Sequence, residues 1–137
     1  MSRRGFTLIE LLSVIVILAI LVTIALPGFT RTTERAQQRQ AWDMLQTIYA
    51  SEQVFFSVNS TYSGTWADPV NPDLGDYMDN PNTPAATYTV VAGIGPLPTF
   101  TATATRSGAG QCGGATMTIN QARTMGGPWL TCPIGGL

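Results

Sequence analysis

A single apolar run near the N-terminus constrains this chain more than any other feature of its sequence. No charged residue occurs between Leu11 and Leu26, and extending the run back to Phe6 adds only one, Glu10. As a helix, these 21 residues would measure about 31 Å, which is close to the hydrocarbon thickness of a bilayer. We therefore expect a transmembrane helix here.

The residues on either side of the run indicate how it is used. Arg3 and Arg4 precede it, and because basic residues stay cytoplasmic, we expect the N-terminus inside and the chain from about Gly28 outside. The run exceeds the roughly 7–15 apolar residues of a secretory signal peptide, and no small-residue cleavage pattern follows it. The helix should therefore stay attached to the protein. Since proline lacks an N–H donor and clashes with the preceding turn, Pro27-Gly28 should loosen or kink the helix.

The composition of the chain excludes several classes of catalytic and metal site. The 137 residues include no His and no Lys, which excludes Ser-His and Cys-His nucleophile pairs, His-ligated metals and Schiff-base lysines. Paired carboxylates remain, so an enzyme is the weakest hypothesis and not an impossible one. Residues 1–39 carry five arginines and two glutamates, whereas residues 40–137 carry two arginines and six acidic residues. Binding to a phosphate backbone needs clustered basic residues, so this balance argues against a nucleic-acid partner.

Glu10 is the anomaly of the apolar run. A carboxylate inside a spanning segment costs about 2.5–3.5 kcal/mol and is a functional candidate by default. A simpler interpretation is that Glu10 lies near the membrane surface and reaches water. However, the segment Arg4-Gly5-Phe6-Thr7-Leu8-Ile9-Glu10 resembles the prepilin leader-peptidase motif of type IV pilins and type II secretion pseudopilins. Against this resemblance stands the alternative of a plain membrane anchor.

The resemblance implies a sequence of events. A prepilin peptidase and methyltransferase would cleave after Gly5, where the backbone is least hindered, and methylate the new terminal amine of Phe6. Glu10 would then neutralise that amine on a neighbouring subunit, because two charges that are costly alone in an apolar medium become tolerable as a pair. The implied partners are the inner-membrane pilus assembly machinery and copies of the chain itself. Filament packing would locally unwind Pro27-Gly28.

Beyond Phe29 the pattern becomes amphipathic, with one apolar stripe at helical spacing: Ala41, Leu45, Ile48 and Phe55. We predict one helix from about Phe6 to Val58, whose second half packs on a sheet. A loop rich in Gly, Pro and Asn follows, with one short turn of helix around residues 74–78.

Four aspartates lie in that loop: Asp68, Asp73, Asp76 and Asp79. A calcium site is one interpretation, because calcium takes several oxygen ligands. Their spacing does not match an EF-hand loop, and we favour a solvated acidic loop with no metal and no cofactor.

Three segments alternate as strands do: 87–92, 99–105 and 115–120. In the second, Phe100, Ala102 and Ala104 should face one way, and in the third Met117 and Ile119 should face inward. The expected fold is α+β, with an antiparallel meander packed on a long N-terminal helix, as in the pilin fold.

Two cysteines, Cys112 and Cys132, lie in the part expected outside the membrane, where thiols pair, so we predict a disulfide. The stretch from Cys112 to Ala122, ending in Cys132, resembles the C-terminal disulfide-bounded region of Gram-negative type IVa pilins. Secretion pseudopilins more often hold this region with calcium, so the resemblance favours a pilus.

Four segments follow from these expectations: a leader peptide over 1–5, a membrane and filament-core helix over 6–29, an amphipathic helix over 30–58 and a β-sheet head over 59–137. The leading hypothesis is a structural subunit of a type IV pilus, held in the inner membrane with its head in the periplasm and then polymerised at the cell surface. Adhesion, twitching motility or DNA uptake would be its role. The alternatives are a minor pilin or secretion pseudopilin and, from another class, a membrane-anchored binding module such as a DNA receptor.

Overall fold

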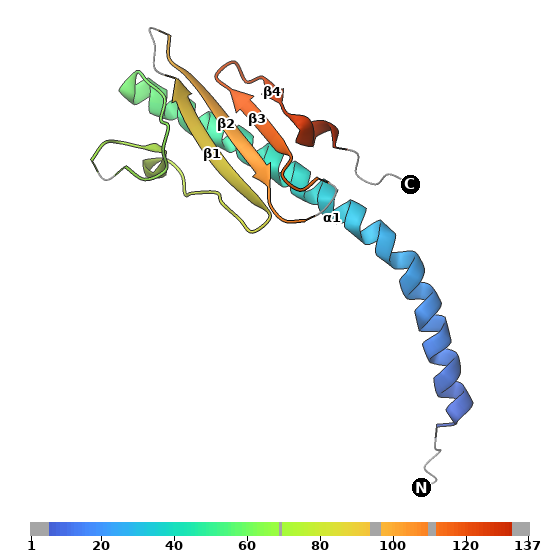
Figure 1. The fold of residues 1–137 in the computed structure, drawn as a ribbon. Coiled ribbons are helices and arrows are strands. Elements are labelled where there is room, and N and C mark those ends of the chain that lie inside the picture. The colour runs from blue at the N-terminus through green and yellow to red at the C-terminus, as the bar shows by residue number, and fades with distance from the viewer. Residues whose placement is uncertain (1–5, 69, 94–96, 110–111, 133–137) are drawn as a thin grey trace. The chain divides into compact units, whose positions relative to one another are not determined.

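The computed structural model describes residues 6–68, 70–93, 97–109 and 112–132, and of residues 25–30 it describes the backbone alone. The chain divides into two compact units, Met1–Glu34 and Arg35–Leu137. Helix α1 (Leu8–Asn59) contributes to both units, and the second unit also contains a four-stranded antiparallel sheet (Figure 1). This α+β architecture confirms the predicted fold class.

Helix α1 spans 52 residues and matches the predicted helix to within two residues at each end. Its backbone is helical through Pro27 and Gly28, and both the predicted kink or loosening there and the unwinding in a filament stay predictions. Among the described residues, no helix is both long and apolar enough to cross a membrane. The predicted apolar run ends at Ala25 and Leu26, whose side chains lie outside the described part of the structure.

The sheet follows the chain order β1-β2-β3-β4, with each strand antiparallel to the next. Strand β1 (Ala86–Gly93) pairs with β2 (Thr99–Arg106), and β3 (Thr116–Asn120) pairs with β2 on its other side. These three strands confirm the three predicted segments. The two-residue strand β4 (Met125–Gly126), which pairs with β3, was not predicted.

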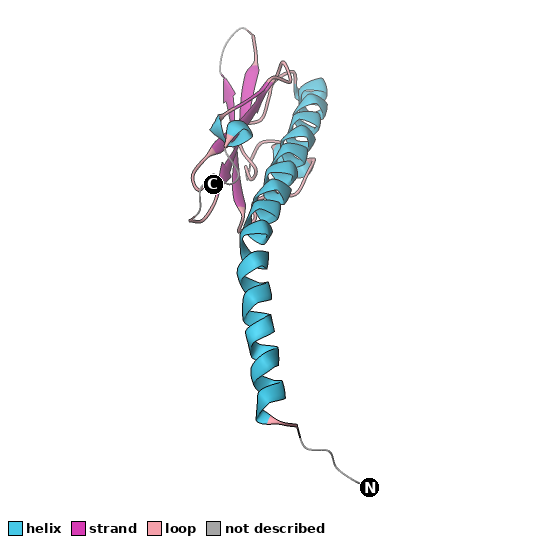
Figure 2. Cartoon of the chain, turned by 90° about the vertical axis from the view of Figure 1, so that its right-hand side faces the viewer, coloured by secondary structure: helices cyan, strands magenta, loops and turns pink. Residues whose placement is uncertain are grey.

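The core of the second unit lies between the helix and one face of the sheet (Figure 2). The predicted stripe of α1 is buried, since Ala41, Leu45 and Ile48 are fully buried and Phe55 is 4% exposed. From the sheet, the predicted inward residues are all 0–1% exposed: Phe100, Ala102, Ala104, Met117 and Ile119. The apolar residues at alternate positions of the strands and those at helical spacing on α1 therefore pack together in one core.

Between α1 and β1 the chain forms a loop that closes on the short 3-10 helix η1 (Leu74–Asp76). The loop buries Leu74 completely in the core, and Asp73 caps η1 by accepting a hydrogen bond of 2.7 Å from the N–H of Gly75. Asp76 accepts in return from the N–H of Asp73 at 3.3 Å. The predicted helical turn at residues 74–78 is thus confirmed, and two of the four aspartates have structural roles.

A disulfide joins Cys112 to Cys132 with a Cα–Cα distance of 6.0 Å, as predicted. It ties the 3-10 helix η2 (Pro128–Thr131) to the segment before β3, and η2 in turn buries Trp129 in the core. Gly127 begins η2 at φ 103°, and a Cβ there would lie 2.4 Å from the carbonyl oxygen of Thr116. Only glycine fits this turn, because both the positive φ and the close backbone approach exclude a side chain.

Candidate functional site

The predicted processing site straddles the start of the described chain. Arg3, Arg4 and Gly5 lie outside the described residues, whereas Phe6 is described and is 77% exposed. Residues 6 and 7 precede the first helical residue, Leu8. The predicted cleavage and methylation residues, Gly5 and Phe6, thus lie immediately before the helix that the resemblance assigns to assembly.

Thr7 and Glu10 form a reciprocal cap at the start of α1. The Glu10 carboxylate accepts hydrogen bonds from the backbone N–H of Thr7 at 2.9 Å and from its hydroxyl at 2.7 Å. The N–H of Glu10 donates to the Thr7 hydroxyl oxygen at 3.4 Å. This is a capping box, in which two backbone donors that a helix start leaves free are satisfied by side chains.

The cap gives Glu10 a local role that sequence reasoning missed. The signal was present, because a Thr followed three residues later by a Glu, directly before an apolar run, is the sequence pattern of a capping box. The predicted partner of Glu10, the amine of Phe6 on another copy, would be created only by cleavage. In the uncleaved chain the carboxylate is held by Thr7.

The helix that follows the cap presents apolar side chains on every side. Fourteen large apolar residues between Phe6 and Ile24 are each 45–87% exposed. A helix that is apolar all round is stable only inside a membrane or among other apolar helices. The surface of this helix is therefore a binding surface, whatever covers it.

The two hydroxyl residues on this helix do not interrupt its apolar character. The Ser13 hydroxyl donates to the carbonyl of Glu10 at 2.9 Å, and the Thr23 hydroxyl donates to the carbonyl of Ile20 at 2.7 Å. Both hydroxyl hydrogens are thus satisfied within the helix. Glu10 remains the one ionisable group between Phe6 and Leu26.

The head contains a second notable carboxylate, which sequence reasoning missed. Glu52 is fully buried on the core-facing side of α1. One of its oxygens accepts a hydrogen bond of 3.0 Å from the N–H of Ser63, and its other oxygen, Oε1, has no partner. Burial outweighs the Ser63 hydrogen bond and raises the pKa of Glu52 to about 7. The sequence offered a weak signal, because Glu52 falls between Ile48 and Phe55 on the predicted stripe.

The four loop aspartates do not converge on one point. Asp68 accepts hydrogen bonds from the N–H groups of Val70 and Asn71, and these bonds lower its pKa. In the described part of the chain, no three acidic, His or Cys side chains form a group that could hold a metal ion.

Comparison with known proteins finds partial similarities to pilins and to a secretion protein. A model of the prokaryotic N-terminal methylation motif matches residues 1–26, which contain Gly5, Phe6 and Glu10. The type IV major pilin protein PilA of Myxococcus xanthus is 43% identical over 44% of this chain and 28% of its own length. A fimbrial protein of Moraxella nonliquefaciens is 36% identical over 60% of this chain and 59% of its own length. Over the matched parts this chain is therefore similar to type IV pilins, and its first 26 residues carry the N-terminal methylation motif.

A secretion protein is similar as well. Core protein G of the type II secretion system of Dickeya chrysanthemi is 30% identical to this chain over 60% of the chain and 50% of its own length. The matched parts thus cover 28–59% of these relatives' own lengths. No solved structure gives a significant match. The roles of Gly5, Phe6, Glu10, Pro27 and Gly28 remain predictions.

Proposed function

We propose that this chain is a structural subunit of a type IV pilus of the type IVa class. Its precursor is inserted in the inner membrane with a cytoplasmic N-terminus and a periplasmic head. A prepilin peptidase removes residues 1–5 and methylates Phe6, and the pilus machinery then polymerises the subunit through the first half of α1. Adhesion, twitching motility and DNA uptake are the activities that such a filament would support.

The proposal rests on the first half of α1, where an apolar surface surrounds a single carboxylate, the capped Glu10. Fourteen exposed apolar residues need a partner surface, and Glu10 is the one charge among them. Membrane insertion rests on the sequence between Phe6 and Leu26 and on the motif match over residues 1–26. A filament of packed copies supplies the same apolar surroundings and, in addition, an amine for the carboxylate.

The disulfide favours a pilus over a secretion pseudopilin, although the 30% identity to a secretion core protein keeps the second function in view. A DNA receptor is less well supported. Of the two arginines after residue 40, Arg123 donates to Gln46 at 3.0 Å and lies 5.8 Å from the centre of the Tyr49 ring. Arg106 donates to the carbonyls of Ala85 and Ser107. Both guanidinium groups are used inside the head.

The test is to identify the subunit in filaments sheared from the cell surface and to measure its intact mass. We expect the chain to begin at Phe6, to carry one additional methyl group and to retain the disulfide between Cys112 and Cys132. Recovery of filament subunits that still carry Met1 would refute processing. Filaments that lack the chain altogether, with the chain present in the periplasm beside secretion components, would assign it to the pseudopilins.

A further inference from the structure

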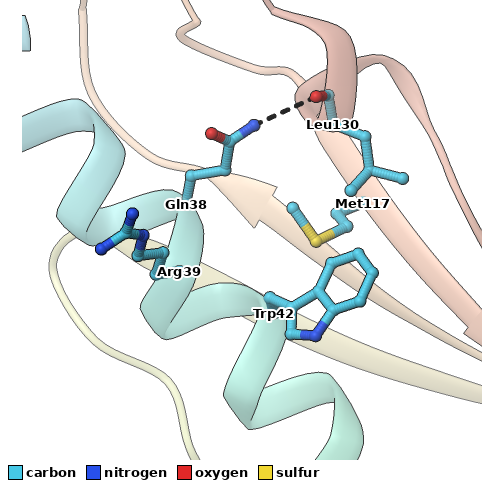
Figure 3. A pocket seen from close by; sticks show the side chains of 5 residues that line it. All are labelled: Gln38, Arg39, Trp42, Met117 and Leu130. Carbon is cyan, nitrogen blue, oxygen red and sulfur yellow. Dashed lines mark hydrogen bonds between the residues drawn. The ribbon is translucent and has the colours of Figure 1, made fainter.

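A groove opens on the head between α1, β3 and η2. Figure 3 shows its lining, in which Trp42, Met117 and Leu130 supply apolar surface while Gln38 and Arg39 stand on the α1 side. Its volume is about 230 Å³, more than the roughly 150 Å³ of an apolar cavity that takes a benzene ring. The groove is therefore large enough for an aliphatic side chain.

The groove has a fixed wall and a charged rim. The Gln38 amide donates to the carbonyl of Trp129 at 2.6 Å and to the carbonyl of Leu130 at 3.3 Å, so these bonds hold η2 against α1. Figure 3 shows the bond to Leu130. Trp42 is 40% exposed, which is unusual for a large aromatic side chain beside a packed core. Arg39 is exposed at the same rim. The site thus suits an apolar group with a negative charge beside it.

The same head presents a group of that chemistry on its loop before β1. Val70 is 85% exposed, more than any other large apolar side chain described from Arg35 onward. Asp68 lies two residues before it and accepts hydrogen bonds from the N–H groups of Val70 at 2.9 Å and Asn71 at 3.1 Å. The side-chain amide of Asn71 also donates to the Asp68 carboxylate, at 3.2 Å. These bonds keep Asp68 ionised and hold it beside the valine.

Trp42, which itself lines the groove, is followed by the exposed carboxylate of Asp43. The other exposed large apolar residues described in the head lack this combination. Val91 lies on β1 among Val90 and Ala92, Leu97 lies between prolines, and Val58 is followed by Asn59. Val54 has Glu52 nearby in sequence, but that carboxylate is fully buried. Outside the groove lining, Val70 is therefore the one exposed large apolar residue described in the head that has an accessible carboxylate within two residues of sequence.

We propose that the groove of one copy receives Val70 from a second copy, with Asp68 of that copy pairing with Arg39. The loop that holds Val70 leads into β1, whereas the groove is lined by residues of α1, β3 and η2. Strands β1 and β3 lie on opposite sides of β2 in the sheet (Figure 1). A projection and a groove at different places on one chain make a head-to-tail contact, which continues into a helical filament instead of closing a dimer. This inference rests on the proposed polymeric function.

The direct test is site-specific cross-linking in filaments. Two variants, Trp42→Cys and Val70→Cys, are expressed together, and sheared filaments are treated with a mild oxidant. We expect a disulfide-linked dimer that contains one copy of each variant, with Cys112–Cys132 intact by peptide mapping. Val58→Cys, which is also an exposed valine at 67%, replaces Val70→Cys in the control and should give no link to Trp42→Cys. Filaments in which the two pairs link equally, or in which neither links, would overturn the proposal.

Charge reversal gives a second measurement that does not depend on cysteine chemistry. Arg39→Glu should lower the ratio of filament to membrane-pool subunit about fivefold, the factor that corresponds to about 1 kcal/mol for an ion pair near a surface. Arg35→Glu is the matched control, because Arg35 is an exposed arginine of the same helix that does not line the groove. Equal losses in the two variants would contradict the contact. If wild-type cells form no filament, the proposed function fails instead.

Discussion

The two halves of α1 place apolar residues in opposite environments. Between Leu8 and Ile24 every large apolar side chain is at least 45% exposed, whereas Ala41, Leu45 and Ile48 in the second half are fully buried. The second half has a stripe that fits a sheet of its own chain, and the first half is apolar on every side. Hydrophobicity alone therefore does not decide burial in this protein. The partner surface decides it.

We therefore expect folding and assembly to depend on different residues. The head buries its apolar stripe, Cys112 and the carboxylate of Glu52 within one chain, so we expect its stability to be a property of the monomer. The large apolar side chains of the first half of α1 are exposed, and we expect a membrane or other copies to cover them. Substitutions in the first half should change assembly with little effect on head stability, and substitutions in the head core should do the reverse.

The largest effect is expected at Glu10. Glu10→Gln removes the charge but preserves the cap, because Gln also serves at the third position of a capping box. The precursor should insert and be cleaved as wild type does. Filament formation should fall about 100-fold or more, because the amine of Phe6 would be buried without a counter-ion, at a cost of roughly 3–5 kcal/mol. The ratio of sheared filament to membrane-pool subunit measures the effect.

Thr7→Ala is the matched control for Glu10→Gln. It removes the hydroxyl of the cap, which costs roughly 1 kcal/mol of helix stability, and leaves the carboxylate charge in place. Assembly of Thr7→Ala should therefore stay close to wild type. If the two variants lose filaments to the same extent, the loss does not depend specifically on the charge of Glu10, and the docking role is wrong.

A smaller effect, on the stability of the head and not on assembly, is expected at the disulfide. Cys132→Ser opens a loop whose ends are 20 residues apart and should lower the free energy of unfolding of the head by about 3 kcal/mol. Leader cleavage should continue, because the processing site lies in the other unit. Chemical unfolding of the full chain in detergent, followed by tryptophan fluorescence to which buried Trp129 contributes, measures the loss. Reduction of the wild-type protein should reproduce it, and an unfolding midpoint that ignores reductant would contradict the role of the bridge.

Much of the head could be predicted because its patterns are local. Alternation predicted the inward residues of β2 and β3, and helical spacing predicted the burial of Ala41, Leu45, Ile48 and Phe55. Two cysteines in the part of the chain expected outside the membrane predicted the bridge. Strand β4 escaped prediction because two residues carry no period. The groove escaped because Gln38 meets η2 across 91 residues of sequence, a contact that no local pattern encodes.

The burial of Glu52 was not predicted for a different reason. Charged residues are almost never fully buried without a partner, so a Glu on an apolar stripe is expected to turn to solvent. In this head the loop after α1 covers it, and the N–H of Ser63 is the partner it receives. The head therefore contains a titratable group in its core, while the first half of α1 displays its own charge at the surface.

That difference gives the smallest of the expected effects, and one that depends on pH. Burial raises the pKa of Glu52 to about 7, above the value of 4.5 that it would have in the unfolded chain. The folded state therefore binds the Glu52 proton more tightly than the unfolded chain does. The stabilisation of the fold that results is complete below about pH 4.5 and is lost as the pH rises through about 7. The head should lose roughly 2 kcal/mol of stability between pH 5 and pH 8 from this group.

Glu52→Gln stays neutral at every pH and should remove that part of the pH dependence, so the variant should exceed wild type in stability at pH 8. Asp43→Asn, which removes an exposed carboxylate from the same helix, should leave the slope unchanged. Urea unfolding of the full chain in detergent at the two pH values decides the matter, because a slope shared by wild type and Glu52→Gln would mean that Glu52 is ionised in the folded head.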